Sequence, residues 1–179
     1  VVIHDEEVDR TTNGHGKVRN LTLNQLKALD AGQGESIPTL AEVLDRFGGK
    51  FLINIELKNY ASILDALPVK VAHLVASRHM AASVLISSFN PINLPRFRQH
   101  CAGAKVGLLI LPGKIKHWLW RMFRVDALHP HYQDVDALLV SAVQGRGREV
   151  NVWTVDDPDQ ICRLTNLGVD SIITNDPLR

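Results

Sequence analysis

The sequence is poor in cysteine, which excludes two classes of scaffold. Its two cysteines, Cys101 and Cys162, stand far apart and form no Cys-x-x-Cys spacing. This pattern argues against both a zinc site and a disulfide framework. We therefore expect two buried thiols in a reducing compartment and, by default, a cytoplasmic protein.

Long apolar runs and excess charge of one sign are also absent. No stretch approaches the ~18 apolar residues of a membrane span, and no basic-plus-apolar signal segment opens the chain. Lys and Arg number 20 against 19 Asp and Glu, a net charge of +1. No global field therefore recruits nucleic acid or an anionic membrane, and a charged partner must be bound locally.

What the 179 residues do contain, at 45% apolar composition, is enough for the core of one domain. Short β-branched runs alternate with capped helical stretches from about residue 50 onward, a pattern typical of βαβ units and a parallel sheet. The pattern predicts six strands, at residues 51–58, 83–89, 105–111, 125–129, 149–155 and 171–175.

Helix signals lie between the later strands and before the first one. Asp157 can cap a helix that ends at Gly168, and a second helix is predicted over 134–145. The buried stripe expected on that second helix consists of Leu138, Leu139, Ala142 and Val143. Two capping boxes precede residue 50, Thr22 with Gln25 for a helix ending near Gly32 and Thr39 with Glu42 for one ending near Gly48.

Parallel strands with intervening helices suit either a doubly wound sheet or a (β/α)8 barrel. The doubly wound fold needs a glycine-rich phosphate loop after a strand, and no Gly-x-Gly spacing in the chain follows one. A barrel instead collects polar residues at the carboxyl ends of its strands. Five of the predicted strands end in this way, which favours the barrel and one shared site.

The first predicted strand has the most informative polar end. Alternation places Asn54, Glu56 and Lys58 on one face and apolar residues on the other. An edge strand with a solvated face would give the same pattern. Because both faces of a parallel sheet are covered, polar residues at one end are costly to bury unless they are used. The functional interpretation is a carboxylate and an ammonium group aimed into a barrel mouth.

Other candidate residues end later strands. They are Ser87 and Ser88 before Phe89, His129 before Pro130, and Trp153 before an acidic pair. Trp153 suits a core position as well as a ligand platform, and His129 and His131 share that ambiguity. No metal-binding spacing connects the histidines.

His4 differs from the other histidines because it ends an apolar run and precedes Asp5. A histidine in that position can act as a general acid or base near neutral pH, with the carboxylate fixing its tautomer. An exposed loop histidine is the alternative.

Together these residues resemble a known family. The strings VVIHDEEVDRTTNGHGKV, IPTLAEVL, NIELK, LISSF, VNVWTV and GVDSIITNDP are similar to those of the glycerophosphodiester phosphodiesterases, from residue 1 to residue 177. The resemblance implies a phospholipase-C-like (β/α)8 TIM-type barrel. It also implies metal-dependent hydrolysis of a small-molecule glycerophosphodiester to glycerol 3-phosphate and an alcohol, as in lipid metabolism.

The resemblance further implies roles for individual residues. His4 would be one of two catalytic histidines, the acid that protonates the leaving oxygen. Glu56 would be a ligand of a divalent cation, and Ca²⁺ or Mg²⁺ suits such an all-oxygen site. Lys58 would hold the phosphate oxygens.

Three more residues would contact the substrate. Trp153 would line the glycerol end of the pocket, and Phe89 and His129 are carried over as substrate-binding residues by strand position more than by motif. No partner protein is indicated, and the oligomeric state is not predicted.

The sequence also departs from the family. Family members begin with a strand ending in His-Arg-Gly, which carries the other catalytic histidine, and a second strand with a Glu-x-Asp pair of metal ligands; neither string occurs here. We therefore expect one domain over 1–179 that lacks the first two barrel strands, with a small helical insertion near 5–37 and six strands within 51–175. The alternative is a catalytically dead barrel remnant that serves as a binding module.

The segment 113–124 raises a further alternative. In helical projection its apolar stripe consists of Ile115, Trp118, Leu119, Met122 and Phe123, with only positive charges and Trp120 off the stripe. The stripe suits a barrel helix packed on the sheet. A basic amphipathic helix could instead make weak contact with a membrane surface, which would suit a lysophospholipase-D-like activity.

Overall fold

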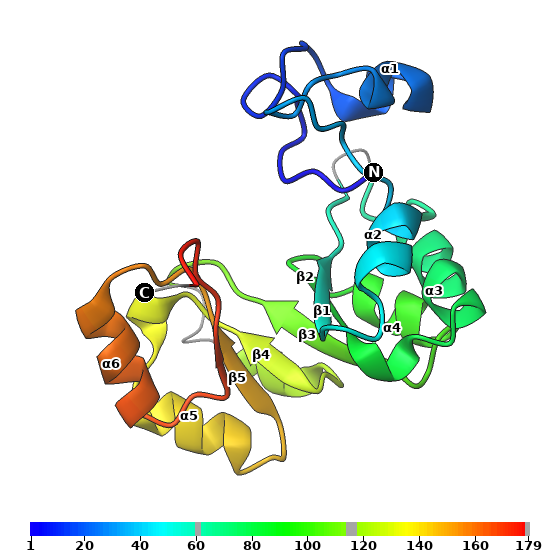
Figure 1. The fold of residues 1–179 in the computed structure, drawn as a ribbon. Helices are drawn as coiled ribbons and strands as arrows, with labels where there is room; N and C mark the ends of the chain where they lie inside the picture. The colour runs from blue at the N-terminus through cyan, green and yellow to red at the C-terminus, as the bar shows by residue number, and fades with distance from the viewer. Residues whose placement is uncertain (60–61, 114–117, 178–179) are drawn as a thin grey trace. The chain divides into compact units, whose positions relative to one another are not determined.

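The chain forms two compact units. The computed structural model describes residues 1–59, 62–113 and 118–177. The first unit consists mainly of Val1–Leu52, and the second of Ile53–Asn59 with the chain from Ile63 onward. In Figure 1 the colours run from blue and cyan in the first unit to green, yellow and red in the second. Within these residues no helix is long and apolar enough to cross a membrane.

The first unit has a small core and little regular structure. Val8, Leu26 and Ile37 form one buried cluster, and Leu44 is buried as well. The antiparallel bridges Glu7–Lys17 and Asp30–Ser36 close two of its turns. It contains the short 3₁₀ helix η1 (Val18–Asn20) and the helices α1 (Leu23–Lys27) and α2 (Leu40–Phe47). That residues 5–37 form an insertion into a barrel stays a prediction.

Both predicted capping boxes form. Thr22 and Thr39 each accept a hydrogen bond from the backbone N–H three residues later, and the glutamine or glutamate there accepts one in return. Helix α2 ends at Gly48 as expected. Helix α1 ends at Ala28, earlier than predicted, because Asp30 Oδ1 accepts from two backbone N–H groups of the following glycine turn and holds the chain out of the helix.

The second unit contains one parallel sheet of six strands in the order β1-β2-β3-β4-β5-β6. The strands are β1 (Ile53–Glu56), β2 (Val84–Ser88), β3 (Lys105–Leu109), β4 (Ala127–His129), β5 (Glu149–Val152) and β6 (Ser171–Ile172). All six fall inside the predicted runs, and every pair is parallel. The predicted α/β class with six strands is therefore confirmed.

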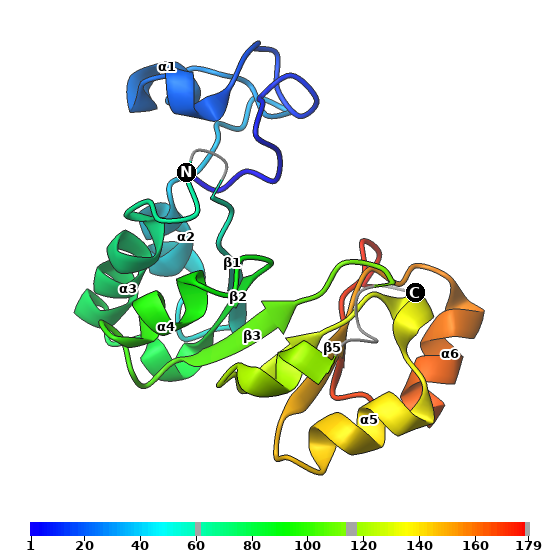
Figure 2. The same ribbon diagram turned by 180° about the vertical axis from the view of Figure 1, so that it is seen from behind.

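Helices connect successive strands of the sheet. They are α3 (Leu67–Ser77), α4 (Asn93–Arg98), α5 (Ala137–Gln144) and α6 (Pro158–Asn166), with the 3₁₀ helices η2 (Ala81–Ser83), η3 (Trp118–Met122) and η4 (Tyr132–Asp134). Helix α4 packs against β2 and β3 and also against α3, while α5 packs against β5. Figures 1 and 2 show α5 and α6 beside the β4–β5 part of the sheet in both views.

The register assigns the strand residues to two faces. Glu56 pairs with Ser87, Ser87 with Gly107, and Gly107 with Ala127, and paired residues of parallel strands share a face. The other face carries apolar residues such as the fully buried Ile86. The side chains that end the strands on the Glu56 face therefore gather at one edge of the sheet.

Helix α5 differs from its prediction in two respects. Its cap is Asp136 rather than Asp134, because the chain first makes the turn η4. Leu138, predicted in the buried stripe, is 81% exposed, while Val140 and Val143 are buried. Val140 and Val143 are three residues apart on one side of the helix, and this side is the one buried when α5 packs against β5.

The segment around η3 differs from the α-helix predicted over 113–124. Residues 114–117 lie outside the described residues, and Trp118–Met122 form a 3₁₀ helix rather than a turn of α-helix. Trp120, predicted off the apolar stripe, is buried at 5% exposure, and Met122, predicted on it, is 66% exposed.

Of the two thiols predicted to be buried, Cys101 is buried as expected, whereas Cys162 is exposed.

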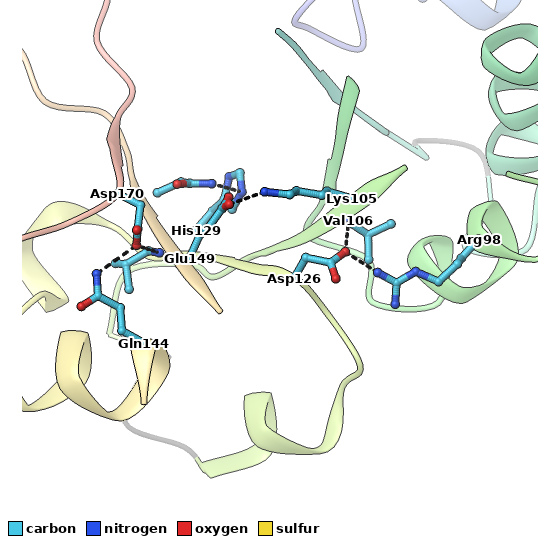
Figure 3. A network of polar contacts seen from close by, with 10 residues as sticks. Arg98, Lys105, Val106, Asp126, His129, Gln144, Glu149 and Asp170 are labelled. Carbon is cyan, nitrogen blue, oxygen red and sulfur yellow. Dashed lines mark hydrogen bonds and ion pairs between the residues drawn. The ribbon is translucent and has the colours of Figure 1, made fainter. Parts of the chain in front are cut away.

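Two aspartates brace the amino end of the sheet (Figure 3). Asp126 Oδ2 accepts from the Val106 N–H at 2.8 Å, and Asp170 Oδ2 accepts from the Val150 N–H at 2.7 Å. The N–H of each aspartate donates to the carbonyl of the same strand residue. A helix side chain completes each arrangement, Arg98 for Asp126 and Gln144 for Asp170. We call this pair the amino-end aspartates.

Candidate active site

The carboxyl end of β1 carries the predicted carboxylate and ammonium. Glu56 is the last residue of β1, and Lys58 follows two residues later. Glu56 Oε1 lies 2.9 Å from Lys58 Nζ, and the two side chains are only 27% and 20% exposed. The strand thus holds an ion pair of opposite charges, partly shielded from water, at the edge where the strands end.

A row of buried polar atoms extends from Glu56 across the sheet. Ser87 Oγ and His129 Nδ1 are buried and make no hydrogen bond within the described part of the chain. Glu56 Oε1 is also buried, and its partner is the Lys58 ammonium. Glu56 and Ser87 are register partners, Gly107 is the next partner along, and the His129 ring lies over Gly107. We call these four residues the buried polar row. Because buried polar atoms are nearly always paired in proteins, such a row is typical of a ligand site.

His129 is held as a neutral imidazole in this row. It is fully buried, and burial lowers the pKa of His129 to about 4. Its Nε2 lies 3.2 Å from the Asn151 side-chain amide. With Asn151 Nδ2 donating to Nε2, the proton of the neutral ring resides on Nδ1, the atom without a hydrogen-bond partner among the residues described.

Aromatic rings meet beside the row. Trp153 has the Phe89 ring at 5.4 Å and the His131 ring at 5.3 Å, both nearly perpendicular to it. Its indole N–H donates to the His129 carbonyl at 2.8 Å. Phe89 and Trp153 follow β2 and β5, which a flat sheet would separate by about 14 Å. The contact between their rings therefore indicates that the sheet curves toward this face.

A hydrogen-bonded cluster supports the loop that carries Lys58. Asn93, fully buried at the start of α4, donates to Ser88 Oγ at 2.9 Å and to the side-chain oxygen of Asn59. Ser88 Oγ in turn donates to the Leu57 carbonyl at 2.8 Å. The backbone on either side of Lys58 is thus tied to β2 and α4. Sequence reasoning missed Asn59 and Asn93, because their partners are distant in the chain.

His4 lies in the first unit and has the expected carboxylate partner. His4 Nδ1 is 2.6 Å from Asp5 Oδ1, and Arg10 contacts both oxygens of Asp5, at 2.5 and 3.1 Å. The hydrogen bond from Arg10, and after it the one from His4, holds the pKa of Asp5 well below its usual range. The Asp5 carboxylate, as acceptor, favours the tautomer of neutral His4 that carries its proton on Nδ1.

The structure thus groups some of the predicted site residues. Glu56 and Lys58 form one pair, and Phe89 and Trp153 form another. His129 supports Trp153 through its backbone carbonyl, while its ring is fully buried. The catalytic, substrate-binding and metal-binding roles themselves stay predictions. Sequence reasoning missed Asn151, which contacts His129, and Arg10, which contacts the Asp5 partner of His4. The ring contact of His131 with Trp153 also joins residues that are distant in the chain.

The donor set fits a divalent cation only in part. Glu56 supplies a buried carboxylate oxygen, Oε1, which in this structure faces the Lys58 ammonium and which suits one ligand position for Ca²⁺ or Mg²⁺. No group of three or more His, Cys, Asp or Glu side chains converges within residues 1–59, 62–113 and 118–177. Glu56 is therefore a candidate single ligand, and a complete coordination shell is not identified.

Comparison with known sequences finds consistent similarity along the chain. The family model described as the glycerophosphoryl diester phosphodiesterase family matches residues 1–179. A glycerophosphodiester phosphodiesterase from Caldanaerobacter subterraneus subsp. tengcongensis is 40% identical over 187 residues, covering 99% of this chain and 76% of the relative. A glycerophosphodiester phosphodiesterase from Bacillus altitudinis is 32% identical, with 99% and 78% covered.

Solved structures give the same result. An Oleispira antarctica phosphodiesterase, determined in complex with the product sn-glycerol 3-phosphate, superposes with a TM-score of 0.86 at 28% identity, covering 98% of this chain and 75% of that one. A glycerophosphodiester phosphodiesterase from Thermotoga maritima superposes with a TM-score of 0.72 at 26% identity, with 96% and 74% covered.

Proposed function

The chain belongs to the glycerophosphoryl diester phosphodiesterase family, and we propose that it hydrolyses glycerophosphodiesters to glycerol 3-phosphate and an alcohol with the help of a divalent cation. Membership makes it a phosphoric diester hydrolase. The observation that carries the proposal is the buried polar row, in which Glu56 is ion-paired with Lys58 while Ser87 Oγ and His129 Nδ1 have no hydrogen-bond partner among the described residues and can bind a polar ligand. We further propose that the six-stranded sheet is part of a (β/α)8 barrel.

The charges at the end of β1 suit a phosphodiester. Its phosphoryl group is anionic and resists attack, so a cation near the oxygens lowers the barrier. Lys58 places an ammonium group where it can hold a phosphoryl oxygen, and Glu56 offers one ligand to Ca²⁺ or Mg²⁺. A bound cation would neutralise charge on the phosphoryl oxygens.

The aromatic pair suits the remainder of the substrate. Phe89 is 37% exposed beside Trp153, and apolar ring faces can pack against the carbon chain of glycerol. In this proposal His129 has two supporting roles. Its backbone carbonyl accepts a hydrogen bond from the Trp153 indole and so orients it. Its neutral ring can donate a hydrogen bond from Nδ1 within the row.

His4 supplies the proton in the proposed reaction. Asp5 and Arg10 hold its Nδ1 side, so a protonated ring releases its exchangeable proton from Nε2 to the leaving oxygen. Its role rests on the family resemblance of the string that contains it.

The test is a direct assay of the full-length protein. Release of glycerol 3-phosphate from sn-glycero-3-phosphocholine and sn-glycero-3-phosphoethanolamine is measured before and after chelation, and after Ca²⁺ or Mg²⁺ is restored. We expect activity to disappear on chelation and to return with the cation. No release from either substrate with either cation would favour the catalytically inactive binding module instead.

Variants assign the roles. His4→Asn and Glu56→Gln should each lower kcat at least 100-fold, and Glu56→Gln should also weaken activation by the cation. Lys58→Gln should raise KM and lower kcat. The control Lys70→Gln, at an exposed position of α3, should change neither constant. Unchanged kcat in both His4→Asn and Glu56→Gln would contradict the assigned chemistry.

A further inference from the structure

A cluster of positive charge surrounds Trp120 at the amino end of the sheet. The Trp120 side chain is buried at 5% exposure. The guanidinium carbons of Arg121, Arg146 and Arg148 lie 5.4, 5.9 and 5.9 Å from the centroid of its ring. Arg121 follows Trp120 in η3, and the other two arginines lie in the turn between α5 and β5. Two segments that are distant in the sequence thus bring three guanidinium groups to one indole.

These arginines are not neutralised by neighbouring carboxylates. Arg146 donates to the Ala142 carbonyl at 2.9 Å and Arg148 to the Trp120 carbonyl at 3.3 Å. None of the three forms an ion pair with Asp or Glu among the residues that the structure places. The nearby acids have other partners, since Glu149 pairs with Lys105 and Asp126 with Arg98. Because a guanidinium group has five N–H donors, most of the donors in the cluster remain for a ligand.

We propose that Trp120, Arg121, Arg146 and Arg148 form a binding site for a phosphate group. The three guanidinium groups lie within about 12 Å of one another and repel each other electrostatically. An anion bound among them would be attracted by all three, which offsets this repulsion. Guanidinium groups bind phosphate oxygens in bidentate fashion. The buried indole holds the groups by cation–π contacts, which reduces the side-chain entropy that binding would otherwise cost.

This site is separate from the candidate active site. Trp120 and Arg121 precede β4, and Arg148 precedes β5, so all four residues lie where strands begin. Glu56, Lys58 and Trp153 lie where strands end. In a parallel sheet the strands all begin on one side and all end on the opposite side. A phosphate bound at Trp120 is therefore not the one that reacts, and it belongs either to a soluble phosphate ester or to the head group of an anionic lipid.

The first test is calorimetric titration of the full-length protein with inorganic phosphate at constant ionic strength. The Lys58→Gln background removes the proposed phosphate contact of the active site. In that background we expect phosphate to bind, and Arg146→Gln/Arg148→Gln to weaken the affinity at least tenfold. The control Lys50→Gln/Lys70→Gln removes the same charge from exposed positions and should change the affinity less than twofold. Equal affinities in the arginine and lysine double variants would overturn the proposal.

A conservative variant guards against loss of folding. Arg146→Lys/Arg148→Lys keeps the charge but loses the bidentate geometry and the planar contact with the ring. We expect an affinity between those of the parent and the glutamine variant, together with an unchanged melting temperature. An affinity equal to that of the parent would mean that charge alone attracts phosphate and that the built site does not exist.

Vesicles identify the source of the phosphate. Protein that sediments with phosphatidylglycerol vesicles but not with phosphatidylcholine vesicles, and only while the arginines are present, would assign the site to an anionic lipid. Binding of inorganic phosphate without sedimentation would assign it to a soluble phosphate ester. Absence of both would overturn the proposal.

Discussion

At the scale of single residues, one glycine determines where a histidine can lie. A Cβ atom on Gly107 would be 2.4 Å from His129 Nε2, far inside contact distance. The hydrogen at Gly107 leaves the space that the imidazole occupies, and that position buries the ring and lowers its pKa. The neutral state of His129 is therefore a consequence of a residue on the neighbouring strand.

The first prediction concerns the effect of pH on stability. The pKa of His129 is about 4 in the folded protein, below its ordinary value of 6.5, so the unfolded chain binds the proton more readily. The free energy of unfolding should be constant above pH 6.5 and fall by on the order of 3 kcal/mol as pH drops to about 4. Urea unfolding as a function of pH measures this. In His129→Gln the fall over that window should shrink, and an unchanged slope would refute the assignment.

The second prediction concerns Gly107→Ala. The added methyl group must displace the His129 ring, so we expect a loss of about 2 kcal/mol or more in the free energy of unfolding. Gly103→Ala is the control, because its Cβ would lie 3.4 Å from the Ala81 Cβ, and it should change stability by less than about 1 kcal/mol. Adding His129→Ala should remove most of the clash energy, and strict additivity of the two substitutions would argue against direct contact.

At the scale of elements, the two amino-end aspartates make the same set of hydrogen bonds to neighbouring strands. Each follows a valine and opens a strand, and its carboxylate and N–H bind one residue of the neighbouring strand. The carboxylate accepts a hydrogen bond from a backbone N–H at the start of the β-ladder, where a shift of strand register would begin. Two short elements, β4 and β6, are thereby held in register with β3 and β5.

The third prediction follows from these contacts. Asp126→Ala and Asp170→Ala should each cost about 1–3 kcal/mol, because a buried N–H loses a charged acceptor. Hydrogen exchange should accelerate most at the Val106 amide in the first variant and at the Val150 amide in the second. Glu149→Gln breaks only the ion pair with Lys105 at the same edge and should cost less than about 1 kcal/mol. Uniform exchange changes across the sheet would contradict a local role.

At the scale of the whole molecule, the two units differ in their capacity to stabilise themselves. The first unit has a small buried cluster of Val8, Leu26 and Ile37 with partly buried neighbours, and Leu44 is buried in α2. The second unit contains a six-stranded sheet covered by helices. Since stability grows with the apolar area buried, the first unit should open at a lower free energy than the sheet.

The fourth prediction tests this difference by native-state hydrogen exchange. Val8→Ala should cost about 1–3 kcal/mol in the first unit and accelerate exchange at the Val18 amide, which donates to the Glu6 carbonyl. Amides in β2 and β3 should be unaffected. Val143→Ala, in the core of the second unit, should do the reverse. Equal acceleration everywhere in both variants would mean that the chain opens only as one cooperative unit.

The strands, the capping boxes and the polar ends were determined by the sequence, because each depends on neighbours within a few residues. The alternation in 51–58 placed Glu56 and Lys58 on one face, and Thr39 with Glu42 started a helix that ends at Gly48. Within 113–124, the helical projection was wrong for Trp118–Met122 because it assumed an α-helix. A 3₁₀ helix with Trp120 packed inside is favoured there by tertiary contacts that outweigh local periodicity.

Only the tertiary structure decided which of these residues meet. Phe89 and Trp153 touch because the sheet curves, and curvature arises from the twist of all its strands together. His129 is neutral because the neighbouring strand presents a glycine, and Trp120 gathers arginines from two distant segments. Local spacing encodes the type and face of a residue, whereas partners across the sheet and the burial that shifts a pKa depend on the packed fold.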